Sequence, residues 1–451
     1  MMETPNLTVS TDDLRMGMFV AELDQPWLGT PFPLEGLFID EQEQLDELRR
    51  LCREVVIDLR RSAAESVRHL PGLPRDSSGA ETGRNSARVS VARHVRSWWD
   101  KQLAALFGRR TVEPPPKPRI QGMPAGVELV VWRDTKAFDQ AMGPARHVYR
   151  DIEATMKTVM VDLSEKREIS AEALTGAASE LVESVAVNPE AMMWLTRMRQ
   201  RNERTYMHGV EVAIYMVTLG RHLGFPRDHL TNFCMIGLLL DVGMTRVDNA
   251  LLERAGPLSP DELTEVRRHV DFGLEILANS PGIDPTVREA IAQHHERIDG
   301  SGYPRGLLGH QIAFAARMAA LADSFAALTT HRPHAEPLSA FNAMKVLFND
   351  AGTLFAEPLV EQFVQAVGLF PVGSLVELST GEVAAVVSHN KVRRLKPRVL
   401  ILADRNKKVL DSPSERNLLL DPTDADGAQV RILRGLSAGA YGVNPRDFFL
   451  T

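Results

Sequence analysis

The sequence predicts a mainly α-helical fold, in which a helical domain follows a small α+β module and precedes a short β-rich tail. Apolar residues recur at helical spacing over residues 126–370. Short apolar runs punctuated by proline and glycine fill residues 1–61, and β-branched residues alternate with turn residues over residues 371–451. These three observations place a helical bundle between the two smaller parts.

The first segment, residues 1–61, is expected to form a compact α+β module. Between residues 41 and 52, Leu45, Leu48 and Leu51 follow helical spacing. The run Val55-Val56-Ile57 then returns to a strand pattern, because β-branched residues favour extended backbone.

Residues 62–125 are predicted to be a flexible linker. They are polar and poor in aliphatic residues, and the stretch TVEPPPKPRIQG is rich in proline, which favours extended chain. Within the linker, large apolar residues lie beside basic ones and indicate a short amphipathic helix, namely Trp98, Trp99, Leu103 and Leu106. We expect this helix to dock on a neighbouring domain, with a membrane-surface position as the less favoured alternative.

The helical segment, residues 126–370, carries clear helix starts. Ser259-Pro260-Asp261-Glu262 supplies an N-cap serine, a proline at the first helical position and a reciprocal glutamate at the third. Asp284-Pro285 repeats this signal without the glutamate.

In residues 371–451, PVGSLVELSTGEVAAVVSHN and PRVLILADRNKKVL predict a hairpin or small sheet.

Composition limits the class of protein. With 451 residues, of which 44% are hydrophobic, the chain is long enough for more than one core. A net charge of -7 gives no indication of a nucleic-acid partner. Two cysteines, Cys52 and Cys234, make a disulfide framework improbable, and no apolar run approaches the roughly 18–20 residues of a membrane span. Because the first residues also lack a signal-peptide pattern, we expect a cytoplasmic protein without a transmembrane segment.

The most informative stretch is His294-His295-Glu296-Arg297-Ile298-Asp299-Gly300-Ser301-Gly302-Tyr303-Pro304. It places two adjacent imidazoles and two carboxylates before a glycine-rich loop. Neighbouring side chains near a helix end point about 100° apart, so both imidazoles reach one metal only if the backbone is held firmly. The two glycines permit the turns that follow, and the proline restricts the loop.

Three further donors precede or follow this stretch. His269 lies on the margin of the apolar stripe of the helix expected from Pro260, and His208 opens another apolar helix. Asp323 lies in the apolar run AFAARMAALADSFAAL, where a carboxylate requires a compensating partner. Arg317, six residues away, points to another side of the helix, so metal ligation is the favoured interpretation of Asp323.

These motifs resemble the HD-GYP family, bacterial phosphodiesterases that cleave cyclic di-GMP, whose catalytic domain is an HD-type helical bundle. HGVEVAIY, RRHVDFGLEIL and the GYP stretch match its histidine segments. The amino-terminal module is similar to a domain of unknown function that often precedes HD-GYP domains. The resemblance implies a divalent metal, with iron, manganese and zinc all compatible with the donors.

The resemblance also implies which residues bind metal. Asp241 would be the catalytic residue that bridges two ions. It would share one site with three histidines, His269, His294 and His295. It would share the second, weakened site with His208 and Asp323.

Two positions depart from the family pattern. In Leu238-Leu239-Leu240-Asp241-Val242-Gly243-Met244, Leu240 replaces the histidine of the His-Asp pair and Met244 replaces a lysine. A leucine has no lone pair for a metal, and a methionine offers no cation to a phosphate. Arg204 stands where some members place a glutamate that recruits a third metal, so we expect no third ion.

The GYP loop, Asp299 to Pro304, matches the family without substitution. By resemblance it lines the substrate pocket and contacts diguanylate cyclase domain proteins. The residues expected to bind substrate are Gly300, Gly302, Tyr303, Pro304, Arg305 and Arg332. Both arginines have the planar geometry that holds a phosphate through two hydrogen bonds.

Three functions are compatible with this sequence. The favoured hypothesis is a divergent HD-GYP protein that binds cyclic di-GMP or a related dinucleotide at a metal site, with hydrolysis weakened or lost. The second is an active metal-dependent cyclic di-GMP phosphodiesterase, in which water or another side chain fills the vacant positions. The third is a non-catalytic adaptor that binds signalling partners through the GYP loop.

Overall fold

The computed structural model describes residues 6–24, 37–39, 42–58, 62, 66–67, 70, 120–198, 205–254, 256–330, 336–390, 394–420, 422–424, 427 and 429–443. The chain forms two compact units, residues 1–110 and residues 111–451. The amphipathic helix expected at Trp98 and Trp99 lies outside the described residues.

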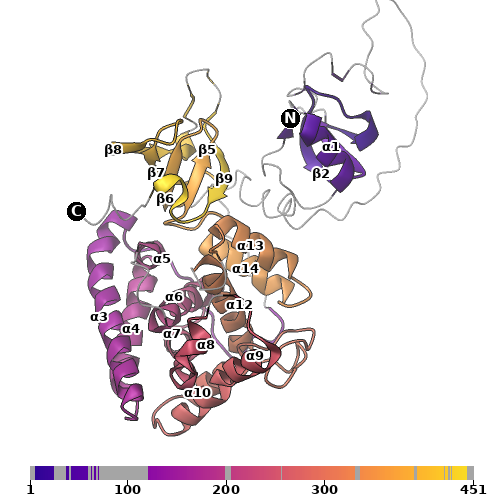
Figure 1. Cartoon of the computed structure of the whole chain (residues 1–451). Coiled ribbons are helices and arrows are strands. Elements are labelled where there is room, and N and C mark those ends of the chain that lie inside the picture. The colour runs from indigo at the N-terminus through magenta and orange to yellow at the C-terminus, as the bar shows by residue number, and fades with distance from the viewer. Residues whose placement is uncertain are drawn as a thin grey trace, which may run out of the picture. The chain divides into compact units, whose positions relative to one another are not determined.

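The described part of the first unit contains a small antiparallel sheet and an α-helix, which confirms the α+β module (Figure 1). Its strands lie in the order β1-β4-β2-β3. The helix is α1 (Gln42–Leu51), and the strands are β1 (Asn6–Ser10), β2 (Phe19–Leu23), β3 (Leu37–Phe38) and β4 (Glu54–Asp58). Leu48 from the helix and Ile57 from β4 are fully buried in the same core, as their apolar spacing predicts.

The second unit is mainly helical, as the sequence predicts (Figure 1). Its first helices are α3 (Phe138–Ser164), α4 (Ala171–Val187), α5 (Pro189–Arg197), α6 (Thr205–Leu223) and α7 (Arg227–Leu239). After the short helix η3 (Val242–Arg246) come α8 (Asn249–Leu252), α9 (Pro260–Arg267), α10 (His269–Ala278), α11 (Pro285–Gln293), α12 (Phe314–Thr329), α13 (Ala340–Asn349) and α14 (Glu357–Val367).

Glycines allow α6 and α7 to pack closely at the centre of the bundle. A Cβ added to Gly209 of α6 would lie 3.0 Å from the carbonyl oxygens of Gly237 and Leu238 on α7. Such a contact is tighter than side chains normally tolerate, so only glycine lets the two backbones approach this far. The close approach brings the start of α6 beside the end of α7, where the donors His208 and Asp241 lie.

The two expected helix starts are present, but one expected helix is divided. Ser259 and Glu262 form the predicted capping box of α9, and Asp284 accepts a hydrogen bond from the backbone amide of Thr286 at the start of α11. The helix expected from Pro260 through His269 is instead two helices, which meet at Arg268.

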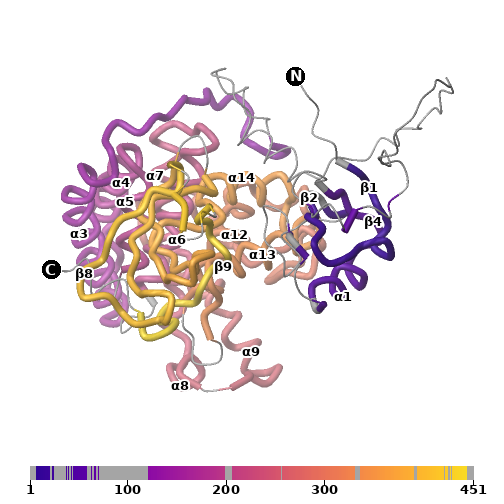
Figure 2. Tube along the Cα trace, turned by 90° about the horizontal axis from the view of Figure 1, so that it is seen from above, coloured from indigo at the N-terminus to yellow at the C-terminus, as the bar shows by residue number. Residues whose placement is uncertain are grey.

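A five-stranded antiparallel sheet follows the helices, which confirms the expected β-rich tail. Its order is β8-β7-β6-β5-β9. The strands are β5 (Leu375–Leu378), β6 (Val383–Ser388), β7 (Arg398–Ala403), β8 (Val409–Asn417) and β9 (Ile432–Leu436). Seen from above, the sheet overlies the helical bundle, and β9 contacts α13 (Figure 2). Within the part of the chain that is described, no helix is both long and apolar enough to cross a membrane.

Candidate metal centre

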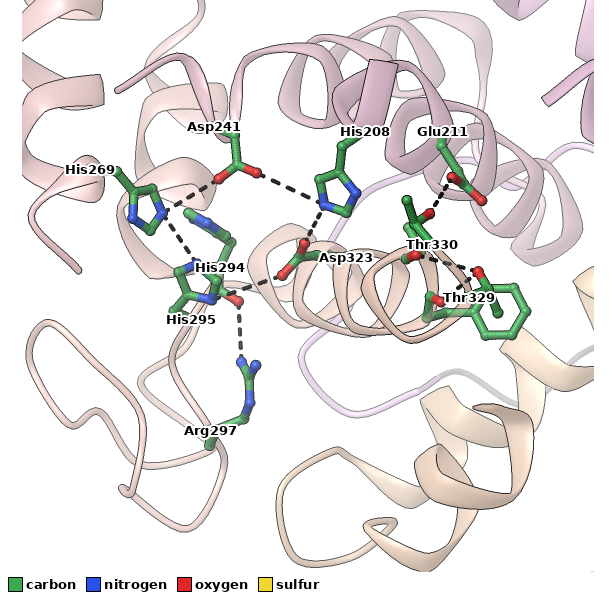
Figure 3. A network of polar contacts seen from close by, with 12 residues as sticks. His208, Glu211, Asp241, His269, His294, His295, Arg297, Asp323, Thr329 and Thr330 are labelled. Carbon is green, nitrogen blue, oxygen red and sulfur yellow. Dashed lines mark hydrogen bonds and ion pairs between the residues drawn. The ribbon is translucent and has the colours of Figure 1, made fainter. Parts of the chain in front are cut away.

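Six predicted donors come together in the helical unit, although they lie on five different parts of the chain (Figure 3). His208 lies in the first turn of α6, Asp241 follows α7, and His269 begins α10. His294 and His295 follow the last residue of α11, and Asp323 lies on α12. The fold therefore gathers side chains that are up to 115 residues apart in sequence.

The donors form two groups that share one carboxylate. Ligand atoms within each group all lie within 4.8 Å of one another. The first group contains Asp241, His269, His294 and His295, and the second contains His208, Asp241 and Asp323. Asp241 lies between the two, because its Oδ1 is 3.5 Å from Nε2 of His269 and its Oδ2 is 3.9 Å from Nε2 of His208.

Backbone carbonyls orient two of the imidazoles. Nδ1 of His269 donates a hydrogen bond of 2.8 Å to the carbonyl of Val266, and Nδ1 of His294 donates one of 2.6 Å to that of Ile291. A carbonyl only accepts, so the proton of each neutral ring lies on Nδ1 and the lone pair on Nε2 faces the centre. Among the described residues, Nε2 of His294 is buried and has no hydrogen-bond partner. This orientation by a carbonyl is the arrangement found around metal-ligating histidines, so the residues fit a divalent ion.

Burial and charge favour the forms of these side chains that bind metal. Burial lowers the pKa of the His294 imidazole, and burial together with neighbouring His294 lowers that of His295 well below the ordinary value. Burial alone would raise the pKa of Asp323. However, His208, whose Nε2 lies 2.7 Å from Oδ1 of this carboxylate, lowers it below the ordinary value. These shifts favour the neutral form of the His294 and His295 imidazoles and the ionised form of the Asp323 carboxylate, and these are the forms that bind divalent cations.

The two substituted positions leave apolar groups at this centre. Leu240 is fully buried, directly before the shared carboxylate of Asp241. Met244 lies partly buried on η3, three residues beyond Asp241. The second donor group therefore has three donors rather than four, and η3 supplies no cation at the place where the family resemblance expects one.

The start of α10 differs from the expectation for His269. His269 is fully buried rather than marginal. Its Nδ1 donates a hydrogen bond to the carbonyl of Val266 in the last turn of α9, and α9 and α10 meet at Arg268. Helical periodicity did not predict this division, because spacing along the chain does not reveal a side-chain hydrogen bond that competes with the backbone bonds of a helix.

Glu296 organises the GYP loop, a role that the sequence analysis did not assign. Its buried carboxylate accepts hydrogen bonds of 2.8 Å from the backbone amides of both Arg305 and Leu307. The amide of Tyr303 donates to the carbonyl of His295 at 3.2 Å. The signal available in the sequence was a carboxylate directly after two histidines, but its partners lie nine and eleven residues away.

The expected substrate-binding residues have different surroundings. Gly300 has a φ of 84°, and a Cβ at Gly302 would lie 2.5 Å from the carbonyl oxygen of His295, so both positions require glycine. The ring of Tyr303 stacks on His295, with centroids 4.6 Å apart. Pro304 and Arg305 are exposed. Arg332 and Arg204 lie outside the described residues.

A second buried carboxylate lies beside the centre. Glu211 is one turn after His208 on α6 and accepts hydrogen bonds from the hydroxyls of Tyr215 at 3.1 Å and Thr330 at 3.3 Å (Figure 3). It does not face the donors. Its contact with Thr330 instead ties α6 to the end of α12, which carries Asp323.

A helical bundle that gathers histidines and aspartates from separate helices defines an HD-domain protein. A family model described as an HD domain matches residues 186–357, and one described as a domain of unknown function (DUF3391) matches residues 6–174. Cyclic di-GMP phosphodiesterase PA4108 of Pseudomonas aeruginosa is 32% identical over 409 residues, which cover 89% of this chain and 86% of that protein. The chain therefore belongs to the HD-GYP family, as its motifs predict.

Other relatives match a shorter part of the chain. The cyclic di-GMP phosphodiesterase response regulator RpfG of Xanthomonas campestris is 34% identical over 33% of this chain and 39% of its own length. The 3'3'-cGAMP-specific phosphodiesterase 2 of Vibrio cholerae is 31% identical over 37% of this chain and 32% of its own length. Among solved structures, Bd1817 of Bdellovibrio bacteriovorus matches with a TM-score of 0.41 and 16% identity, covering 80% of this chain and 98% of that one.

Proposed function

We propose that this protein binds cyclic di-GMP or a related cyclic dinucleotide at a metal-containing centre and that its capacity for hydrolysis is weakened or lost. The observation that carries the proposal is the convergence of six donors, of which Asp241 belongs to both groups, next to a buried leucine at position 240. The relatives named as phosphodiesterases of cyclic di-GMP or 3'3'-cGAMP supply the ligand class.

The four-donor group of Asp241, His269, His294 and His295 would hold one ion, and the three-donor group would hold a second ion more weakly. Imidazole and carboxylate donors suit iron, manganese or zinc. A bound divalent ion would supply Lewis acidity toward a phosphodiester oxygen. The protein itself would contribute the fixed orientation of His269 and His294, through the carbonyls of Val266 and Ile291.

Hydrolysis requires charge stabilisation that this chain only partly offers. Leu240 provides no lone pair, and Met244 places no ammonium near a phosphoryl oxygen. Removal of one charge-stabilising group typically lowers the rate by roughly 10²–10³-fold. Two such losses leave binding of the dinucleotide as the dominant activity.

The test combines metal analysis with turnover. Protein purified without oxygen should contain divalent metal, bind cyclic di-GMP and release little linear dinucleotide or GMP. The double variant Leu240→His, Met244→Lys should gain turnover. Rapid hydrolysis by the unmodified protein would contradict the proposed impairment. Protein that contains no metal and does not bind cyclic di-GMP would contradict the proposal as a whole.

A second candidate function is an active phosphodiesterase. The similarity to a cyclic di-GMP phosphodiesterase over most of both chains favours it. In that case the unmodified protein should already turn over cyclic di-GMP rapidly, and the double variant should bring little further gain.

A further inference from the structure

Arg267 is an exposed cation that contacts the aromatic residue of the GYP loop. It is the last residue of α9, and its Cζ lies over the ring of Tyr303, 4.8 Å from the centroid. The same ring stacks on His295, a donor of the metal centre, with an angle of 24° between the planes. Tyr303 therefore connects Arg267 with the donor cluster.

Arg267 differs from its neighbour in having no carboxylate partner within the described chain. Arg268 is also exposed, but its guanidinium pairs with Glu265 at 2.9 Å and lies over Phe272. An aromatic ring holds a guanidinium by its face and leaves the N–H groups at its edge available. Arg267 is thus positioned for an anion, whereas Arg268 already has one.

The position of Arg267 indicates which anion it would meet. Arg267 is exposed and contacts the Tyr303 ring, which in turn stacks on His295, so it lies beside the donor cluster rather than among the donors. A phosphate at the metal donors and a phosphate at Arg267 would be two different groups of one ligand. A cyclic dinucleotide carries two phosphodiesters, so it can supply both.

We propose that Arg267 binds the second phosphate of a cyclic dinucleotide whose first phosphate lies at the metal donors, and that it thereby selects cyclic dinucleotides over ligands with a single phosphodiester. This inference rests on the proposed function. It also assigns a cation to the site at a place other than η3, where Met244 stands instead of the expected lysine. The planar fork of arginine suits bidentate contact with phosphate.

The experiment compares Arg267→Gln and Arg267→Lys with the matched control Arg268→Gln in the full-length, manganese-loaded protein. Calorimetry measures binding of cyclic di-GMP and of bis(p-nitrophenyl) phosphate, which has one phosphodiester. Arg267→Gln should weaken cyclic di-GMP binding about 10- to 100-fold, as expected for loss of hydrogen bonds to a charged group. Binding of the single diester and the metal content should stay unchanged. The affinity of Arg267→Lys for cyclic di-GMP should lie between those of the unmodified protein and Arg267→Gln, because lysine keeps the charge but lacks the planar guanidinium.

The other outcomes distinguish the role of Arg267 from the proposed function. If the unmodified protein binds cyclic di-GMP and Arg267→Gln binds it equally well, the role of Arg267 is refuted while the proposed function stands. Equal losses for both ligands, or equal losses in Arg268→Gln, would also refute a specific contact with a second phosphate. If the unmodified protein binds no cyclic di-GMP, the proposed function fails, and this inference fails with it.

Discussion

The backbone of Gly243 lies directly against the carbonyl oxygen of His269, so closely that a Cβ at position 243 would overlap that oxygen. The same Cβ would come 2.5 Å from the backbone nitrogen of Gly273. This contact fixes η3 against the start of α10. It therefore sets the distance between two donors of the metal centre, Asp241 and His269.

The first prediction concerns this contact. Gly243→Ala should lower the free energy of unfolding by about 1–3 kcal/mol, the usual cost of overpacking, because backbone atoms on both sides cannot move independently. It should also lower metal affinity by separating Asp241 from His269. Chemical denaturation and metal analysis measure the two effects. Gly176→Ala is the control, since a Cβ there meets no atom within 4 Å. Equal behaviour of the two variants would contradict the assigned role of Gly243.

The second prediction concerns the shared carboxylate. Asp241→Asn should reduce metal at both donor groups, because each group includes this residue. His208→Ala should affect the three-donor group alone and leave the other ion bound. Elemental analysis of both variants after identical loading distinguishes these results. Loss of all metal in His208→Ala would show that the groups do not act as two sites.

The third prediction concerns Glu296 and the GYP loop. Glu296→Ala should leave the amides of Arg305 and Leu307 without their acceptor and lower the free energy of unfolding by roughly 1–3 kcal/mol for each lost hydrogen bond to the carboxylate. Hydrogen exchange should become faster in residues 303–309, while bound metal is retained. Asp299→Ala is the control, because its exposed side chain bonds only within the turn at Ser301. Unchanged exchange in Glu296→Ala would refute this account of loop order.

The fourth prediction concerns pH and the carboxy-terminal sheet. Burial alone would raise the pKa of Glu377, but hydrogen bonds from Lys407 and Arg434 lower it below the ordinary value of 4.5. A carboxyl with a lowered folded-state pKa stabilises the fold above its unfolded-state pKa, and this stability is lost as the pH falls through the folded-state value. The unmodified protein should therefore unfold at a higher temperature than Glu377→Gln near neutral pH, and this difference in unfolding temperature should shrink below about pH 4.5.

Glu415→Gln serves as the comparison for this experiment. Glu415 lies 3.5 Å from Arg398 and its side chain is 53% exposed, so solvent screens the pair. Its replacement should leave the pH dependence of unfolding nearly unchanged. A difference between Glu377→Gln and unmodified protein that stays constant with pH would contradict the role assigned to the Glu377 carboxylate.

The sequence was sufficient to predict the fold class and the set of donors, and the reasons are local. Helical spacing and caps such as Ser259 can be recognised from residues within one helical turn, and the donors lie in recognisable sequence motifs. The structure places all six predicted donors within two adjoining groups. Their function as metal ligands stays a prediction.

Other features depend on contacts between distant residues. At the junction of α9 and α10, the imidazole of His269 bonds to the carbonyl of Val266. The role of Glu296 depends on the path of a loop, and the contact between Arg267 and Tyr303 joins α9 to that loop. Spacing along the chain carries no information about such pairs.

The amide of Tyr303 is bonded to His295, and the next residue, Glu296, holds the amides of Arg305 and Leu307. A molecule that shifted this loop would therefore also act on the imidazole of His295. If the centre holds an ion, the affinity for that ion and the affinity for a loop-binding molecule would be coupled, and by thermodynamic reciprocity each would change the other by the same factor. The presence of an ion would then change how strongly the loop binds another molecule.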